Sequence, residues 1–178
     1  MVKGFISKSK IQDKYIMTGK DYKRHINNYS DDLLRYLAKN LQDIDEAKDI
    51  LQDAFIALWE NRTKIENAKV KSWLFTVAHN KMLKLIRHNK VRQNVLDNGF
   101  IQQENERTIK QDIENVQQID YLLSKLNPTQ RQCLTLKEWN GFSIKEIAQI
   151  INISEQNVKV NIFRAKIKLK EIAQNDRI

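Results

Sequence analysis

The 178 residues of the chain are enough for one medium-sized domain or two small ones. Four glycines and one proline are too few for a fold with many turns, so the composition favours long helices. The excess of 31 Lys and Arg over 22 Asp and Glu gives a net charge of +9. This charge suggests an anionic partner, although only its distribution can separate a binding surface from solvated faces.

The sequence gives no sign of a metal, a cofactor or a membrane segment. Cys133 is the only cysteine, so it has no partner for an internal disulfide, and no Cys/His cluster suggests a zinc site. No apolar run approaches the ~20 residues that span a bilayer. Residues 1–20 are rich in lysine but lack the apolar run of a signal peptide. We therefore expect a cytoplasmic protein, not itself a membrane protein, with 1–20 as a basic N-terminal tail.

Residues 21–93 are predicted to form a first helical domain. Apolar residues recur at intervals of three and four from Asp21 to Leu41, which predicts one helix. The same spacing predicts a second helix from about Asp45 to Glu60. A polar stretch then leads to a third helix from Ser72 to about Lys90, whose expected buried stripe runs from Leu74 to Ile86.

The sequence changes character after the first domain. Residues 94–115 are rich in Gln, Asn and Glu and hold few large apolar side chains, which indicates a flexible linker whose C-terminal end could be helical. Periodicity resumes at Val116, and Pro128 is expected to begin a new helix after Asn127. The prediction is an all-α fold of two small helical domains joined by a linker, with 116–178 as the second domain.

A helix-turn-helix is predicted within the second domain. Ser143 and Glu146 have the spacing of a capping box, in which each side chain bonds the backbone N–H of the other residue. Asn152 stands at the expected turn, where it tolerates a left-handed backbone. Ser154 is expected to cap the next helix. A capped short helix, a turn and a second capped helix together favour a DNA-binding motif.

The last helix divides into two faces. Its inward stripe is expected to consist of Val158, Ile162, Ala165, Leu169 and Ile172. The opposite face carries Gln156, Lys159, Val160, Phe163 and Arg164, side chains that can contact phosphates and base edges in a major groove. The alternative is a helical hairpin with a solvated basic face.

The third helix has an aromatic side chain on its polar side. Trp73 falls with Asn80, Lys84 and Arg87, and no acid occurs between Asn67 and Leu96. Such a face suits stacking on unpaired bases while cations follow the backbone. A tryptophan half-buried against a neighbouring helix is an equally good interpretation.

The second helix has the opposite charge on its exposed face. The residues expected there are Asp45, Asp49, Gln52, Asp53 and Glu60, with Ile56 in the middle. An acidic face with an apolar centre, in a basic protein, is typical of a docking surface for a basic partner. Ordinary solvated acids are the alternative.

Taken together, four motifs resemble one known family. They are the stretches 45–59, 71–80, 126–131 and the end of the helix-turn-helix at 161–166. In order and spacing they are similar to the extracytoplasmic function (ECF, group four) sigma factors of the bacterial RNA polymerase sigma-70 family. The resemblance extends from about Tyr22 to Ile172.

The resemblance implies roles for particular residues. The first motif is similar to the helix that binds core polymerase, with Asp49, Gln52, Asp53, Ile56 and Trp59 as the matching residues. The loop 61–70 and the following helix are similar to the parts that recognise and melt the promoter −10 element, with Lys71, Trp73, Asn80, Lys84 and Arg87 as expected strand contacts. The last helix resembles the reader of the −35 element, with Gln156, Asn157, Lys159, Val160, Phe163 and Arg164 facing DNA. Asn157 is a departure, because the family often has Thr there.

The resemblance predicts a sigma factor without catalytic chemistry, which binds core polymerase and directs promoter-specific initiation through −35 duplex and melted −10 DNA. It also implies an anti-sigma partner, commonly membrane-linked. One rival is a stand-alone regulator whose N-terminal half serves dimerisation or sensing. The other is a nucleic-acid enzyme, disfavoured because His25, His79 and His88 lack metal-ligand spacing.

Overall fold

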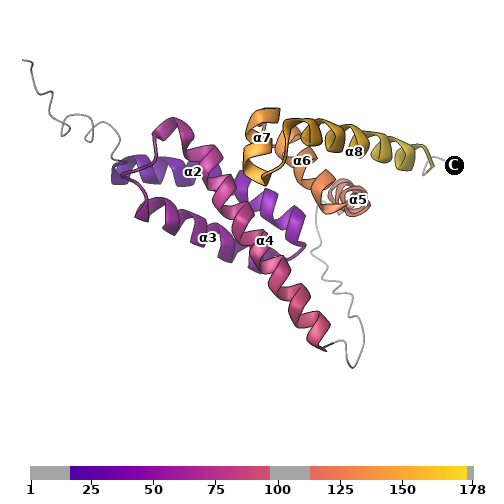
Figure 1. Ribbon diagram of the computed structural model, residues 1–178, viewed down its shortest axis with the longest axis horizontal. Coiled ribbons are helices and arrows are strands. Elements are labelled where there is room, and N and C mark those ends of the chain that lie inside the picture. The colour runs from indigo at the N-terminus through magenta and orange to yellow at the C-terminus, as the bar shows by residue number, and fades with distance from the viewer. Residues whose placement is uncertain (1–16, 97–112, 176–178) are drawn as a thin grey trace, which may run out of the picture.

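The computed structural model describes residues 17–96 and 113–175, and every regular element in these two ranges is helical (Figure 1). The N-terminal group contains α2 (Gly19–Leu41), α3 (Ile44–Glu60), the short 3-10 helix η2 (Asn67–Lys69) and α4 (Val70–Leu96). The C-terminal group contains α5 (Ile113–Ser124), α6 (Pro128–Glu138), α7 (Ile144–Ile151) and α8 (Glu155–Asn175). The all-α prediction is confirmed for the described residues.

The predicted tail and linker are only partly covered by the structure. Residues 1–16 and 97–112 lie outside the described residues. The two ends of the predicted linker are helical, because α4 continues to Leu96 and α5 already begins at Ile113. Met17 is buried and Thr18 caps α2, so ordered structure also begins before Asp21.

Side-chain caps fix where several helices begin. Thr18 accepts a hydrogen bond from the Asp21 backbone, and the Asp21 carboxylate accepts from Thr18, which lowers the pKa of Asp21. Asp43 accepts from two N–H groups at the start of α3. Asn127 caps α6, with Pro128 at its first position as predicted. Each such cap stabilises a helix by about 1 kcal/mol.

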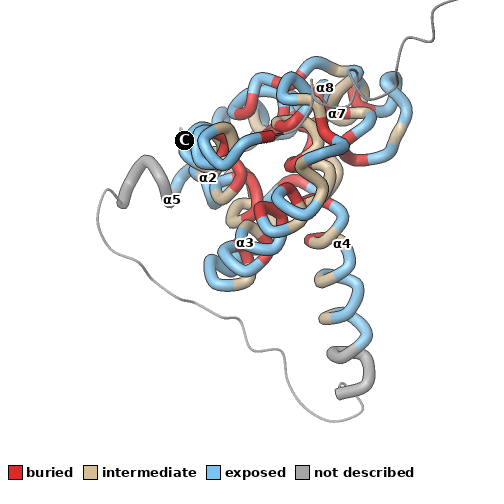
Figure 2. The backbone as a smooth tube through the Cα atoms, turned by 90° about the vertical axis from the view of Figure 1, so that its left-hand side faces the viewer, coloured by how far each residue is buried: buried red, intermediate tan, exposed pale blue. Residues whose placement is uncertain are grey.

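The helices α2, α3 and α4 bury their apolar stripes against one another. The fully buried members include Leu33, Leu37, Ala47, Ala54, Leu58, Leu74, Phe75, Ala78 and Met82, which confirms most of the predicted core. The prediction is wrong for Ile86, whose side chain is 39% exposed. The later turns of α4 project from the body of the molecule (Figure 2), although Asn89 still donates a hydrogen bond to Glu46 of α3 at 3.0 Å.

A buried polar pair links α2 to α4. The Tyr36 hydroxyl lies 2.8 Å from Nδ1 of His79, and both side chains are 1% exposed. Burial raises the pKa of Tyr36 and lowers the pKa of His79 to about 4, because neither charged form is solvated there. The hydroxyl therefore donates to a neutral imidazole. This bond was not predicted from the sequence.

The C-terminal helices enclose a second set of buried side chains, which includes Leu123, Cys133, Leu136, Ile147, Ile150, Val158 and Ala165. Burial raises the pKa of the Cys133 thiol to about 11, in keeping with a small apolar role. Arg131 donates to the carbonyls of Leu123 and Leu126 at the end of α5 and to that of Lys39 in α2. The guanidinium thus satisfies acceptors in both groups of helices.

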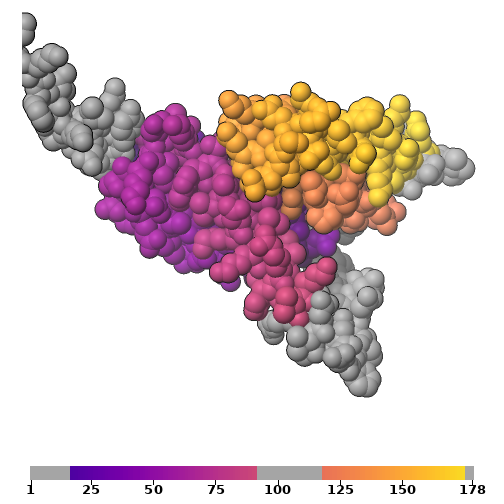
Figure 3. All heavy atoms as spheres, in the orientation of Figure 1, coloured from indigo at the N-terminus to yellow at the C-terminus, as the bar shows by residue number. Residues whose placement is uncertain are grey.

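The two groups of helices pack directly against each other (Figure 3). Phe142, just before α7, meets Phe75 of α4 edge to face at 4.9 Å between ring centroids. Asn140 donates through Nδ2 to the carbonyl of Asp32 and accepts from Lys71 through its own carbonyl. Lys39 and Asp120 form an ion pair across the same contact.

The neutral His79 makes stability depend on pH. Its pKa falls from 6.5 to about 4 on folding, so the unfolded chain binds more protons between these values and folding weakens as the pH falls through that window. We expect the free energy of unfolding to fall between pH 7 and pH 5 by roughly 1 to 2 kcal/mol more than in His79→Asn. Asn keeps an acceptor for Tyr36 but does not titrate. Denaturant unfolding at both pH values measures the difference, and equal pH dependence in the two proteins would contradict it.

Candidate functional site

The helix-turn-helix forms from α7 and α8 as predicted. The Ser143 hydroxyl accepts from the Glu146 backbone at 3.3 Å, and the Glu146 carboxylate accepts from Ser143 in return. These bonds lower the pKa of Glu146. Asn152 ends α7 in the left-handed region with φ 55°, and the Ser154 hydroxyl caps α8 by accepting from the Asn157 backbone. The turn is therefore fixed by side chains that the sequence pattern had indicated.

The structure confirms the predicted two faces of α8. Val158, Ile162 and Ala165 are buried, while Leu169 and Ile172 are half-buried. Among the predicted DNA-facing residues, the exposed ones are Gln156, Asn157, Lys159, Phe163 and Arg164, and Val160 is half-buried. Phe163 is 65% exposed, the largest exposed fraction among the large apolar side chains of the described residues. Exposed cations and one aromatic ring thus share a single helix face.

The exposed face of α3 is acidic, also as predicted. It carries Asp45, Asp49, Gln52, Asp53 and Glu60, all of which are exposed. Ile56 and Trp59 lie on the same helix and are 47% and 40% exposed. Asp53 forms an ion pair with Lys81 of α4 at 2.9 Å, so part of this charge is already balanced. The face combines negative charge with a large apolar surface.

An apolar hollow of about 290 Å³ opens beside this acidic face. It is lined by Gly19 and Tyr22 of α2 and by Ile56 and Trp59 of α3. The Trp59 ring contacts Tyr22, at 5.0 Å between centroids, and the Arg62 guanidinium, at 4.3 Å from its centroid. The sequence did not reveal the hollow, because its two walls come from helices whose contact is visible only in the fold.

The predicted strand-binding residues of α4 do not share one environment. Asn80, Lys84 and Arg87 are exposed. Trp73 is half-buried and packs against the core, which is the alternative that the sequence left open. The Lys71 ammonium donates to the Asn140 carbonyl at 2.6 Å and lies 4.8 Å from the centroid of the Phe142 ring. In this conformation the Lys71 ammonium is therefore bound by the loop between α6 and α7.

The segment 61–69 between α3 and α4 is attached to the first domain by a buried side chain and a hydrogen bond from α2. Ile65 is buried, and Glu66 pairs with Lys69 at 3.0 Å within the segment. His25 of α2 lies 3.0 Å from Asn67 through its Nε2 atom and is itself buried. The sequence indicated His25 only as a residue of a metal-ligating type, and its contact with this segment was not predicted.

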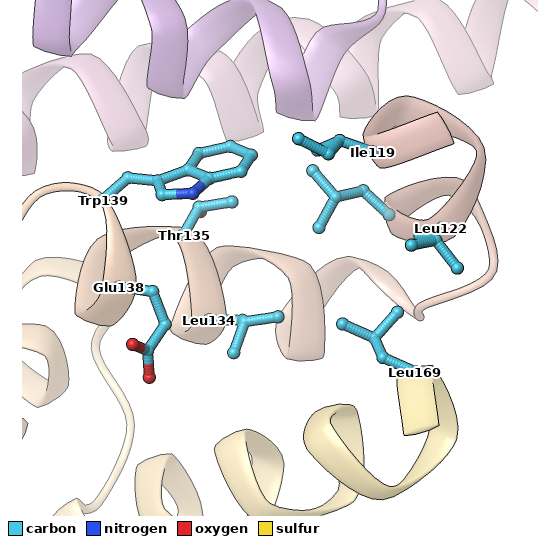
Figure 4. Close-up of a pocket in the computed structure, with 8 residues that line it drawn as sticks. Ile119, Leu122, Leu134, Thr135, Glu138, Trp139 and Leu169 are labelled. Carbon is cyan, nitrogen blue, oxygen red and sulfur yellow. The ribbon is translucent and has the colours of Figure 1, made fainter. Parts of the chain in front are cut away.

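A second apolar hollow, of about 300 Å³, lies among α5, α6 and α8 (Figure 4). Leu122, Leu134 and Leu169 line it together with Ile119 and Trp139, and the last two side chains are themselves exposed.

No helix within the described ranges is both long and apolar enough to cross a membrane. Within 17–96 and 113–175, no three His, Cys, Asp or Glu side chains are grouped so as to hold a metal ion.

Comparison with known proteins assigns the chain to a family. Residues 25–92 match the family described as Sigma-70 region 2, and residues 116–169 match Sigma-70, region 4. The chain is 31% identical over 146 residues to the ECF RNA polymerase sigma factor SigM of Bacillus subtilis, covering 81% of this chain and 90% of that protein. The chain belongs to the ECF sigma factors. It therefore directs promoter-specific transcription by RNA polymerase.

Other similar proteins agree with this assignment. The ferric citrate uptake sigma factor FecI of Escherichia coli is 28% identical, over 75% of this chain and 79% of its own. The sigma factor RpoE of Bartonella quintana, solved with the anti-sigma factor NepR, has a TM-score of 0.75 at 24% identity and covers 87% of this chain and 98% of its own. CnrH, solved with the cytosolic domain of CnrY, has a TM-score of 0.66 at 20% identity, over 89% and 91%. These two structures share the fold of this sigma factor.

The contact around Phe142 should control the separation of the two groups of helices. Phe142→Lys removes the packing against Phe75 and puts a second ammonium beside Lys71, so the packed arrangement is expected to open. We expect the radius of gyration from X-ray scattering to rise while the helical circular dichroism is retained. Phe163→Lys, at an exposed position of α8, is the matched control and should leave the radius unchanged. An unchanged radius in Phe142→Lys would contradict the prediction.

Proposed function

We propose that this sigma factor divides its work among three surfaces: the acidic face of α3 binds core polymerase, α4 with the segment 61–70 holds melted −10 DNA, and α8 reads the −35 duplex. The observation that carries the proposal is the distribution of charge among the helices: the exposed charged positions of α3 are mainly acidic, whereas no acid occurs in α4 or between Gln156 and Lys170 of α8. The corresponding domains would be 21–93 and 116–178, with 94–115 as the linker and 1–20 as a tail.

The proposed polymerase surface consists of Asp49, Gln52, Asp53, Ile56 and Trp59. Negative charges at its edge would steer a basic partner and set its orientation, while burial of exposed apolar area would supply affinity. The Trp59 ring already packs on Tyr22 and Arg62, so less side-chain entropy is lost when a partner covers it. Fixed aromatic rings of this kind are frequent at the centres of protein interfaces.

The proposed −35 surface is the outward face of α8. Lys159 and Arg164 would contact phosphates or guanine edges, Gln156 and Asn157 could bond adenine, and Val160 with Phe163 would contact thymine methyl groups. The left-handed Asn152 and the cap at Ser154 fix the start of α8 relative to α7. A recognition helix needs this rigidity, because base contacts depend on its angle in the groove.

The proposed −10 surface comprises Lys71, Trp73, Asn80, Lys84 and Arg87. The three residues that are exposed would follow the strand backbone, and Trp73 would offer its exposed edge to an unpaired base. Lys71 is bonded to Asn140 and covered by Phe142, so its contact with DNA requires the C-terminal helices to move away. Separation of the two domains on the polymerase would also let them reach promoter elements that are apart along DNA.

An anti-sigma factor is the proposed regulatory partner. The similar proteins RpoE and CnrH were solved with the anti-sigma factor NepR and with the cytosolic domain of CnrY. The apolar hollow among α5, α6 and α8 offers this sigma factor a surface for such a partner, which could be membrane-linked. The sigma factor would act in the cytoplasm, where it meets polymerase and promoter. Its role is binding and positioning, without catalysis of its own.

Reciprocal variants test the proposed division. Asp49→Lys should lower affinity for core polymerase by at least about tenfold, because it sets like charges against a basic partner. The same variant should bind duplex promoter DNA as well as the natural protein does. Arg164→Ala should do the reverse, weakening −35 binding while core binding is unchanged. Fluorescence anisotropy with core polymerase and with promoter DNA measures both affinities.

Asp31→Lys, an exposed acid of α2, is the matched control for the charge reversal. It should leave core affinity unchanged, since it lies outside the proposed surface. Equal losses of core affinity in Asp31→Lys and Asp49→Lys would show a general charge effect in place of a docking face. Unchanged core affinity in Asp49→Lys would remove the α3 face from the proposal.

A further inference from the structure

A buried histidine of α2 contacts the segment that joins α3 to α4. His25 is only 4% exposed, and its ring stacks on Tyr29 with centroids 5.7 Å apart and planes inclined by 12°. Its Nε2 atom lies 3.0 Å from Oδ1 of Asn67. With that oxygen as the acceptor, Nε2 carries the hydrogen, and Nδ1 has no hydrogen-bond partner among the described residues. An apolar ring would fill the same space without leaving a polar atom unpaired.

Asn67 lies at the start of the turn that leads into α4. It is the first residue of η2, and its carbonyl accepts from the backbone of Val70, where α4 begins. Glu66, which precedes η2, makes no side-chain cap to the turn. Among the described residues, the His25–Asn67 bond is the one side-chain hydrogen bond that joins α2 to the segment 61–69. The histidine thus fixes the turn from which α4 starts.

The η2 turn is exposed, although the histidine that bonds it is buried. Asn67 and its neighbours Ala68 and Lys69 are exposed, whereas His25 reaches them from the core. Fixing the backbone of one residue costs about 1 to 2 kcal/mol of conformational entropy. A segment already ordered by the fold does not lose that entropy again when a ligand binds. The His25–Asn67 bond therefore lowers the entropic cost of binding a ligand at this exposed turn.

We propose that His25 is a positioning residue for melted −10 DNA: through Asn67 it holds η2 in the conformation that receives the unpaired strand. This inference rests on the proposed function, which assigns the segment 61–70 to the −10 element. His25 does not touch DNA. Its effect passes through one hydrogen bond to an exposed turn, so loss of that bond weakens strand capture without changing the surfaces on α3 and α8.

Two substitutions separate the hydrogen bond from the bulk of the ring. His25→Phe keeps an aromatic ring beside Tyr29 but removes the donor, and the open complex is expected to fall by about fivefold, the effect of one hydrogen bond of ordinary net strength. His25→Gln keeps a donor near the position of Nε2 and is expected to retain the open complex. Loss in His25→Gln equal to that in His25→Phe would overturn the role of the bond.

The readout is permanganate reactivity of −10 thymines at equal promoter occupancy by the holoenzyme. The template is a promoter selected with the natural holoenzyme, in a fully duplex form and in a form with a mismatched −10 segment. Affinity for core polymerase and for −35 duplex should be unchanged in His25→Phe. A merely structural role for the ring would lower the melting temperature and affect all three readouts together.

A double variant shows whether Asn67 acts with His25 or by itself. Asn67→Ala should match His25→Phe, and His25→Phe/Asn67→Ala should be no worse than either, because both break the same bond. A further loss in the double variant would mean that His25 and Asn67 act independently, which overturns the role of the bond between them. Asn28→Ala, an exposed asparagine of α2, is the matched control and should behave as the natural protein does.

The two hypotheses fail differently. If the natural holoenzyme initiates on no template, the proposed function is wrong and His25 has no −10 strand to position. If the natural holoenzyme melts the promoter and both His25→Phe and Asn67→Ala melt it equally well, only the positioning role is wrong. Should His25→Phe fold poorly, the comparison of Asn67→Ala with His25→Gln decides the same question.

Discussion

The common core of α2, α3 and α4 is the constraint on which the rest of the molecule depends. Each helix gives one apolar stripe to it, and the Tyr36–His79 bond sets α2 against α4 at a single register. Once those stripes are buried, the outward faces of α3 and α4 have fixed directions. The exposed face of α3 is therefore mainly acidic while α4 carries no acid, and the two helices meet at the Asp53–Lys81 ion pair. One small domain can thus offer one surface to a protein and another to a nucleic acid.

The packing of the second domain onto the first determines which of the proposed binding surfaces are exposed. Phe142 and Asn140 are buried against α4 and α2, and Lys71 bonds to the same loop. The outward face of α8 stays exposed in this arrangement, as does the acidic face of α3. Polymerase and −35 DNA could thus meet the packed form, whereas full use of the −10 surface needs the contact to open. The order of binding would follow from which surfaces are free.

Local sequence patterns predicted what local forces decide. The Ser143–Glu146 capping box, the left-handed Asn152 and the helix that starts at Pro128 all depend on residues a few positions apart, and each is found as expected. Helical periodicity identified most buried positions for the same reason. It was wrong for Ile86, because periodicity gives the direction of a side chain but not whether a neighbouring helix covers it.

Contacts between distant parts of the chain were beyond the sequence patterns. Asn140 bonds a carbonyl 108 residues away, and Arg131 reaches one 92 residues away. The hollow beside Trp59 forms only when the N-terminal turn of α2 packs beside α3. The His25–Asn67 bond likewise forms only when η2 packs against α2. Most candidate residues on α3 and α8 could be chosen from charge and spacing, whereas Trp59 and Asn157 were implied by the family resemblance. Their surroundings, which decide how rigidly they are held, depended on the packing of helices.

The most direct test of the account is selection of transcribed templates from a random-sequence duplex library, with core RNA polymerase and this protein as the only added factor. The account predicts transcripts that depend on the protein, from templates that share two short sequence blocks at a fixed separation upstream of the start. Enrichment of a single palindromic block, bound equally well without polymerase and giving no transcript, would contradict it.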